Sequence, residues 1–257
     1  MTNYYMLRSF DHAGYYETRL ILMVVALRLA YHALRRKQDS RYLVMLISGI
    51  FFQALMEYVL QVTGLRGPGY HFSVFGVSMS GIGANLFQGL AEGAIFSVMA
   101  FWFVDLNTSS NPAAPRAAYL RVLALIVLLS CVVGYLSRGQ PITSPRPMFG
   151  VVTVYWLLST AGPAVVLAAW RRGLRYLGYF YIGLLIYNVV TFEPLHILEA
   201  RYIGVRNPSG GFVAAPMPAQ MVVMFCSHLI EVAAQKTHYF AVPFAMGLIR
   251  FRDRQPQ

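Results

Sequence analysis

The chain contains 257 residues, of which 57% are apolar and only 12% are charged, and its net charge is +11. A soluble domain usually carries about 25% charged residues, so this composition excludes an ordinary soluble protein and predicts a membrane protein. The basic residues lie between apolar segments, as they do in the loops of membrane proteins. We therefore expect the positive charge to report on topology, and we expect no nucleic-acid partner.

Seven apolar segments follow one another along the chain, and most are long enough to cross a bilayer as a helix. They cover approximately residues 18–34, 42–63, 84–104, 119–136, 150–170, 176–198 and 221–249. Residues 74–83, rich in glycine and serine, indicate either a frayed helix start or a short re-entrant segment. The pattern predicts an all-α fold, with a single transmembrane domain over residues 1–257 that forms a bundle of seven transmembrane helices.

The distribution of basic residues predicts the orientation of this bundle. With the N-terminus outside, twelve basic residues fall on the cytoplasmic side and seven on the outer side. The seven are Arg8, Arg19, Arg66, Arg138, Arg146, Arg201 and Arg206. Because cytoplasmic loops are enriched in Lys and Arg, we expect an outer N-terminus and a cytoplasmic C-terminus. The location predicted for this multi-pass protein is the plasma or inner membrane.

The seventh segment carries an unusual set of polar residues. His228, Glu231, Gln235 and His238 are spaced by three, four and three residues, which places them on one face of a regular helix. Lys236 points elsewhere. Charges at such depth cost about 2.5 kcal/mol or more each on insertion scales and tend to be functional, so this face is the centre of the predicted site.

Three other segments offer polar residues at overlapping depths in the outer half of the bundle. On the sixth, Asn188, Thr191, His196 and Glu199 are expected to share a face, from which Glu193 points away unless Pro194 kinks the helix. Gly89 and Gly93, four residues apart, indicate close helix packing. On the second and third segments, the polar residues at helical spacing are Gln53, Glu57, Gln61, Asn85, Gln88 and Glu92.

We interpret these residues as one polar chamber in which acid–base chemistry acts on a lipophilic, isoprenoid or lipid-like substrate. Glu231 or Glu57 is the predicted proton donor and His228 its partner or the base. The full catalytic set is Glu57, Glu92, His228 and Glu231, and the substrate-binding set is Gln53, Gln88, Asn188, Glu193, His196, Gln235 and His238. No cofactor is predicted, although Glu92, His196, His228 and Glu231 are compatible with a metal site.

Two resemblances bear on this reading. In length, seven-segment layout and the placement of Glu57 and Glu231, the chain resembles the membrane-bound terpene cyclases. That resemblance implies a carboxyl group that protonates an epoxide or alkene. Residues 229–236 are similar to the acid-then-lysine segment of microbial rhodopsins, which would imply retinal on Lys236 and Glu92 as its counter-ion.

The leading hypothesis is thus a membrane-embedded cyclase or isomerase whose partners are the lipid bilayer and a lipophilic small molecule. One alternative is a proton- or cation-coupled transporter or channel, because acids within spans often mark ion pathways. Another is a subunit that holds a metal or retinal, or an accessory subunit of a membrane complex. The sequence is compatible with a homo-oligomer or a larger complex.

Overall fold

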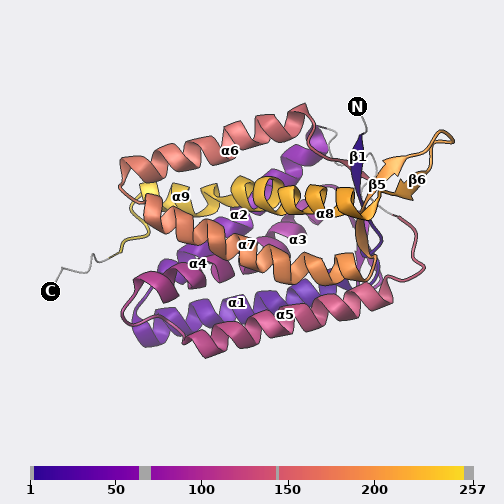
Figure 1. Cartoon of the computed structure of the whole chain (residues 1–257). Coiled ribbons are helices and arrows are strands. Elements are labelled where there is room, and N and C mark those ends of the chain that lie inside the picture. The colour runs from indigo at the N-terminus through magenta and orange to yellow at the C-terminus, as the bar shows by residue number, and fades with distance from the viewer. Residues whose placement is uncertain (1–2, 64–70, 143–144, 252–257) are drawn as a thin grey trace.

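The computed structural model describes residues 3–63, 71–142 and 145–251, and describes only the backbone of residues 151–153, 156, 231 and 232. Seven helical rods lie side by side in this part of the chain (Figure 1). Five are single helices: α1 (Tyr15–Lys37), α2 (Arg41–Val62), α5 (Arg116–Leu136), α6 (Val151–Trp170) and α7 (Leu174–Ile197). The third rod combines α3 (Gly81–Gln88), η1 (Gly89–Gly93) and α4 (Ala94–Thr108). The seventh combines α8 (Met217–Cys226), η2 (Ser227–Ala233), η3 (Ala234–Lys236) and α9 (His238–Ala245).

Five of the rods are long and apolar enough to cross a membrane, which is typical of a membrane protein. They are α2, Gly81–Thr108, α5, α7 and Met217–Ala245. In α6, the part Leu157–Trp170 is apolar but shorter. The rods fall where the sequence predicted apolar segments, whereas a seven-span topology stays a prediction.

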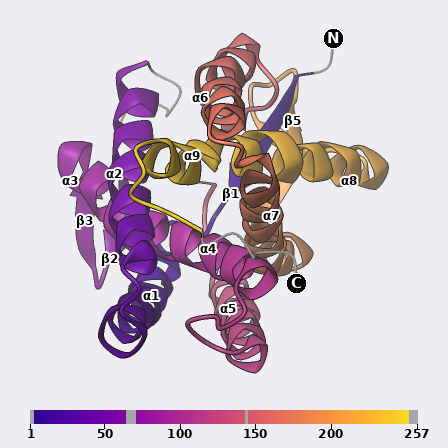
Figure 2. The ribbon, with the colours of Figure 1, turned by 90° about the vertical axis from the view of Figure 1, so that its left-hand side faces the viewer.

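The third rod forms the centre of the bundle. The most apolar stretch of Gly81–Thr108 is 78% buried, against 28% for α5, and α4 lies between α2 and α7 (Figure 2). Glycines allow this close packing. A Cβ atom on Gly183 of α7 would lie 2.7 Å from the Ala100 carbonyl oxygen of α4. A Cβ atom on Gly89 would lie 2.6 Å from the Ile50 carbonyl oxygen of α2, which confirms the close approach predicted for that glycine pair.

The described residues include six short strands. Of these, β1, β5 and β6 lie at the end of the bundle nearest the N-terminus in Figure 1. An antiparallel sheet has the order β4-β1-β5-β6, formed by β1 (Tyr4–Arg8), β4 (Arg146–Pro147), β5 (Arg201–Arg206) and β6 (Phe212–Ala214). A separate hairpin pairs β2 (His71–Val74) with β3 (Val77–Ser80). The all-α expectation therefore holds for the rods but not for this end.

The hairpin also replaces the frayed or re-entrant helix expected at 74–83. Its turn residues Phe75 and Gly76 have φ values of 48° and 78°. Positive φ at two consecutive residues is the geometry of a tight hairpin turn, and the helix then begins at Gly81.

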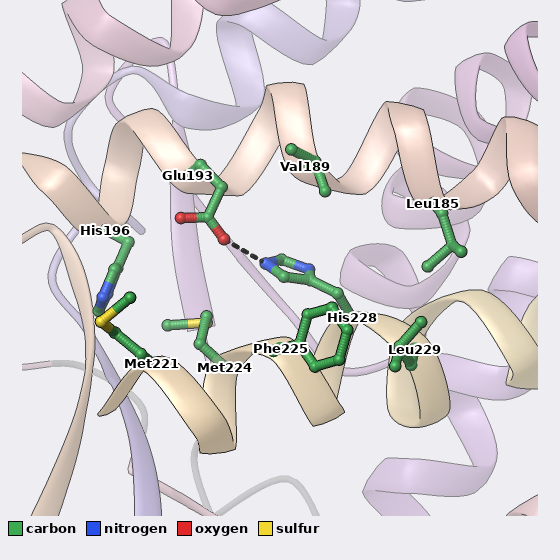
Figure 3. A pocket seen from close by; sticks show the side chains of 9 residues that line it. All are labelled: Leu185, Val189, Glu193, His196, Met221, Met224, Phe225, His228 and Leu229. Atoms are coloured by element: carbon green, nitrogen blue, oxygen red, sulfur yellow. Dashed lines mark hydrogen bonds and ion pairs between the residues drawn. The ribbon is translucent and has the colours of Figure 1, made fainter. Parts of the chain in front are cut away.

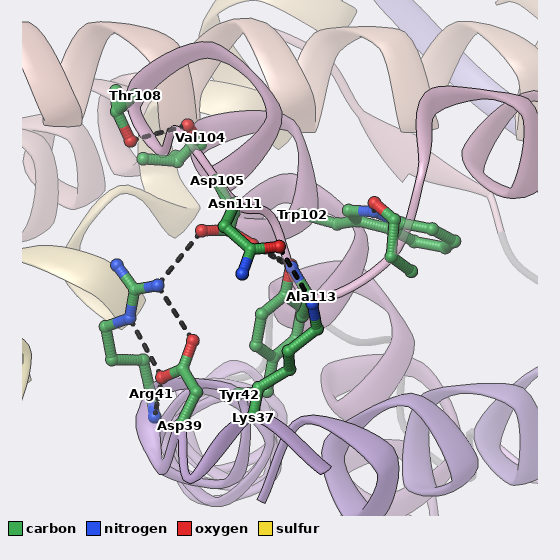
Figure 4. A network of polar contacts seen from close by, with 11 residues as sticks. Lys37, Asp39, Arg41, Tyr42, Trp102, Val104, Asp105, Thr108, Asn111 and Ala113 are labelled. Atoms are coloured by element: carbon green, nitrogen blue, oxygen red, sulfur yellow. Dashed lines mark hydrogen bonds and ion pairs between the residues drawn. The ribbon is translucent and has the colours of Figure 1, made fainter.

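At the end of the bundle opposite the strands, a polar network joins α2, α4 and the loop after α4 (Figure 4). Arg41 binds Asp39 at 2.7 Å and Asp105 at 3.0 Å. The fully buried Asp105 also accepts hydrogen bonds from the Tyr42 hydroxyl at 2.9 Å and from the Ala113 backbone N–H at 2.8 Å. One carboxylate thus ties α2 to α4 and to the loop that follows α4.

Candidate functional site

Two interruptions of helical geometry coincide with residues that the sequence singled out. Glu92 lies in the π-helical segment η1, and His228 and Glu231 lie in the π-helical segment η2. Single π-turns are rare and frequently occur at functional sites. They also shift the helical phase, because a π-turn holds more residues than an α-turn.

This phase shift explains why His228 and His238 do not share one face of the seventh rod, as the sequence predicted. Segment η2 is π-helical and η3 is a 3₁₀-helix, so a spacing based on 3.6 residues per turn fails across them. His228 faces α7, where it meets Glu193. His238 instead packs against Phe52 of α2, with ring centroids 4.9 Å apart. Gln235 is half-buried, and the side chain of Glu231 lies outside the described residues.

A cavity of about 320 Å³ lies between α7 and the α8–η2 part of the last rod (Figure 3). It exists because α8 packs mainly on β5 and η2, whereas η2 packs on α7. Its lining is mostly apolar, with one carboxylate and two imidazoles. The lining residues are Leu185, Val189, Glu193, His196, Met221, Met224, Phe225, His228 and Leu229.

The polar centre of this pocket is a Glu193–His228 pair. The His228 Nε2 atom lies 3.0 Å from Glu193 Oε1, and 4% of the His228 side chain and 37% of the Glu193 side chain are exposed. A carboxylate can only accept, so the shared proton sits on Nε2 and a neutral imidazole keeps a lone pair on Nδ1. That Nδ1 atom is buried and has no hydrogen-bond partner among the described residues. Such orphaned buried atoms are rare and call for an explanation.

His196 and Arg201 complete the polar end of the pocket. His196 Nδ1 lies 2.9 Å from the Arg201 carbonyl oxygen, which fixes the imidazole against the start of β5. The Arg201 guanidinium lies 4.2 Å from the centre of the Phe192 ring and 3.4 Å from Met224 Sδ. It interacts electrostatically with Glu193 and His228, so the polar end of the pocket lies near both a cation and an anion.

Glu193 was predicted to bind substrate, although regular helix geometry pointed it away from the polar face of its own helix. On α7, the residues that face the pocket are Leu185, Val189, Glu193 and His196. The predicted grouping of His196 with Asn188 is wrong, because Asn188 is fully buried and does not line the pocket. The spacing of four, four and three residues is itself helical and could have revealed the pocket-facing side of α7, had apolar residues been counted with the polar ones.

A second polar cluster occupies the interior of the bundle. Arg19 of α1 is 1% exposed, and its guanidinium lies 4.3 Å from the centre of the Tyr15 ring. Its Nη1 atom donates to the Tyr187 hydroxyl at 3.4 Å, and Arg19 interacts electrostatically with Glu92. Sequence reasoning assigned Arg19 to the outer loops. Arg19 lies within the apolar segment 18–34, and this position could have indicated that its side chain is buried.

Glu57 belongs to the same interior cluster. Gln53 Nε2 donates to Glu57 Oε1 at 3.0 Å, and the Tyr239 hydroxyl donates to Gln53 Oε1 at 2.7 Å. Tyr239 interacts electrostatically with both Glu57 and Glu92. The two carboxylates therefore share one environment, where Glu57 is 2% and Glu92 9% exposed.

Three other polar residues that the sequence singled out also lie inside the bundle. Gln88 Nε2 donates to the Tyr16 hydroxyl at 3.0 Å. The amide atoms of Asn188 have no partner among the described residues. The Lys236 Nζ atom lies 4.2 Å from the centre of the Phe96 ring.

The structure thus divides the predicted chamber in two. Glu57 and Glu92 lie in the interior, whereas His228, Glu193 and His196 line the pocket. The candidate metal ligands are divided in the same way, and the described residues contain no group of three His, Cys, Asp or Glu side chains suited to a metal ion. No family model, curated protein or solved structure matches the chain.

Proposed function

We propose that this chain is a membrane-embedded isomerase or cyclase that transfers protons within a lipophilic substrate held between α7 and α8. The observation that carries the proposal is the Glu193–His228 pair at 3.0 Å in an apolar cavity. An imidazole held by a carboxylate at one nitrogen and free at the other is the arrangement of a general base with its orienting group.

The proposed reaction needs no second substrate. His228 Nδ1 accepts a proton from a carbon next to a carbonyl group conjugated or adjacent to the double bond, the electron pair moves onto the carbonyl oxygen as an enolate, and Glu193 stabilises the imidazolium across their hydrogen bond. The imidazolium then returns a proton to another carbon of the same molecule. The double bond moves, the substrate keeps its mass, and the histidine is neutral again. His is the most common group for such transfers.

The apolar surroundings favour this chemistry. Because the pocket is lined by aliphatic, aromatic and thioether side chains, charge interactions within it are stronger than in water. Met221 and Met224 are flexible and can repack around an irregular hydrocarbon. Together these features suit a lipid more than a polar metabolite.

A lipid-conversion assay tests the proposal. The full chain in nanodiscs would be incubated in D₂O with an extract of membrane lipids. We expect one lipid to change its chromatographic retention at constant mass or to gain one non-exchangeable deuterium. The variants His228→Gln and Glu193→Gln should abolish or strongly slow this change, since the base or its orienting partner is lost.

Matched controls lie outside the pocket. His32 is exposed on α1, and Glu199 is exposed just after α7. His32→Gln and Glu199→Gln should therefore retain the wild-type rate. Conversion that persists in His228→Gln, or no conversion by the wild-type protein in any extract, would refute the proposal.

A second candidate function, proton or cation transport, is favoured by the interior cluster. Arg19, Glu57 and Glu92 come from three different rods and are all buried. Ionisable residues inside a bundle often mark ion pathways. Flux of protons into liposomes that disappears in Glu92→Gln but persists in His228→Gln would favour transport over catalysis.

We further propose that all seven rods cross the membrane, with the sheet outside and the Arg41–Asp105 network in the cytoplasm. Support comes from the clustering of basic residues at the network end. Those in the described part of the chain are Arg35, Arg36, Lys37, Arg41, Arg116, Arg121, Arg171, Arg172, Arg175 and Arg250. Such clustering is typical of cytoplasmic surfaces.

A further inference from the structure

The pocket between α7 and α8 changes in polarity along its length. On α7 it begins at Leu185 and ends at His196, a rise of about 16 Å at 1.5 Å per residue. Leu185 and Val189 form its deep end, whereas Glu193 and His196 form the end nearest the sheet (Figure 3). An occupant that matches this gradient has an apolar tail and a single polar end.

The surface around the pocket shows from which side an occupant would arrive. Met221 and Phe225, which line the pocket on α8, are each 64% exposed, and Val189 on α7 is 45% exposed. Large apolar side chains at such exposure are expected where a bundle faces hydrocarbon. The pocket therefore opens on the side of the bundle, toward the bilayer.

The charges beside the pocket select the polar end of the occupant. The Glu193 carboxylate is bound to His228 and also interacts electrostatically with Arg201, whose guanidinium lies against Phe192 and Met224. An additional anion would lie against Glu193 and an additional cation against Arg201, and an uncompensated charge in an apolar site is costly. A hydroxyl group can instead donate to Glu193, or to Nε2 of His196 whose Nδ1 already donates to the Arg201 carbonyl oxygen, without changing the charge.

We propose that the pocket binds a single-chain lipid alcohol. The molecule enters sideways from the bilayer, places its hydroxyl group between Glu193 and His196, and directs its chain toward Leu185 and Leu229. This inference rests on the proposed function, because it names the substrate class of the same site. It adds the head group, the orientation and the route of access.

Photo-crosslinking tests this assignment without requiring turnover. Three diazirine lipids of equal chain length would be compared on the full chain in nanodiscs, with a hydroxyl, a carboxylate or an ammonium head group. We expect the alcohol to label α7 and α8 at least about tenfold more than the other two, corresponding to about 1.4 kcal/mol. A diazirine near the head should label close to His196, and one near the tail close to Leu185.

Two tryptophan variants on α7 provide the matched comparison. Val189 lines the pocket, whereas Ile182 is 42% exposed on the same helix and does not line it. Val189→Trp should fill the groove and reduce alcohol labelling about tenfold, a loss of about 1.4 kcal/mol. Ile182→Trp should leave labelling unchanged.

Each other outcome overturns a defined part of the inference or the proposed catalysis. Equal or stronger labelling by the carboxylate or ammonium probe refutes the neutral head group. A reversed order of head and tail labels refutes the orientation, and labelling that survives Val189→Trp refutes the site. Alcohol labelling that persists in His228→Gln, with no lipid conversion by the wild-type protein, would refute the proposed catalysis but not this inference.

Discussion

Replacing Gly93 by alanine should separate two rods and disturb the interior cluster. A Cβ atom at this position would clash with the Gly49 carbonyl oxygen and lie 2.7 Å from Gln53 Cβ. Backbone atoms cannot rotate out of the way as a flexible side chain can, so α2 and η1 must move apart. Overpacking of a well-packed interior typically costs about 1–3 kcal/mol, and we expect Gly93→Ala to fall in that range.

The disturbance should reach the polar residues as well. Gln53, which the new methyl group would push, donates to Glu57 and accepts from Tyr239. A shift of Gln53 weakens both hydrogen bonds, each worth about 0.5–1.5 kcal/mol net. The expected loss for Gly93→Ala is therefore toward the upper part of the range.

Unfolding in mixed micelles with increasing SDS measures this loss. Gly178 in α7 provides the control, because nothing lies within 4 Å of a Cβ atom built there. Alanine is favoured over glycine inside helices by about 0.5–1 kcal/mol, so Gly178→Ala should be neutral or stabilising. If Gly93→Ala unfolds like the wild-type protein, or Gly178→Ala is destabilised equally, the close-packing argument is wrong.

Three further predictions concern the interior, the network and the topology. Arg19→Met should cost about 3–5 kcal/mol, because it removes a buried guanidinium that donates to Tyr187 and interacts electrostatically with Glu92. The double variant with Glu92→Gln should recover part of this loss in the same unfolding assay, and no recovery would deny the coupling. Asp105→Asn should cost about 1–3 kcal/mol, because a neutral amide weakens three charge-assisted hydrogen bonds, and an unchanged unfolding curve would contradict the role of the network. In a background lacking the native cysteines, Ser209→Cys and Ser110→Cys should react with an impermeant maleimide from opposite sides of the membrane, and labelling from the same side would refute the proposed topology.

The rods were predictable because their signal is local. Twenty apolar residues in succession indicate a helix wherever the rest of the chain lies, and the predicted segments agree with the observed rods apart from their ends. The packing role of Gly89 and Gly93 was also visible, since the spacing of four brings both residues to one helix face.

The division of the site was not predictable, because it depends on helix phase. A sequence read at 3.6 residues per turn places His228 and His238 together, but η2 and η3 lie between them. No simple residue pattern predicts a π-turn. The predicted helix face is therefore wrong for every residue that follows the turn. Glu193 was predicted as a substrate-binding residue, but its pairing with His228 was not, because this pairing depends on the phase of the neighbouring rod.

The strands of the four-stranded sheet were missed because they are formed by distant pairs. Residues 4–8 and 201–206 are short, and neither segment is apolar enough to indicate a strand alone. Their register, from Tyr4 opposite Val205 to Arg8 opposite Arg201, is set by the rods that bring them together.

That pairing constrains the order in which the molecule can be completed. During synthesis β1 emerges long before β5, its longer partner in the sheet, and contacts between such distant segments form late. The sheet therefore forms after the helices and holds this end of the bundle together. Because β5 directly follows α7 and contacts α8, the pairing of β1 with β5 also fixes the distance between these two helices. A lesion in β1, far from the pocket in sequence, would then alter the width of the groove.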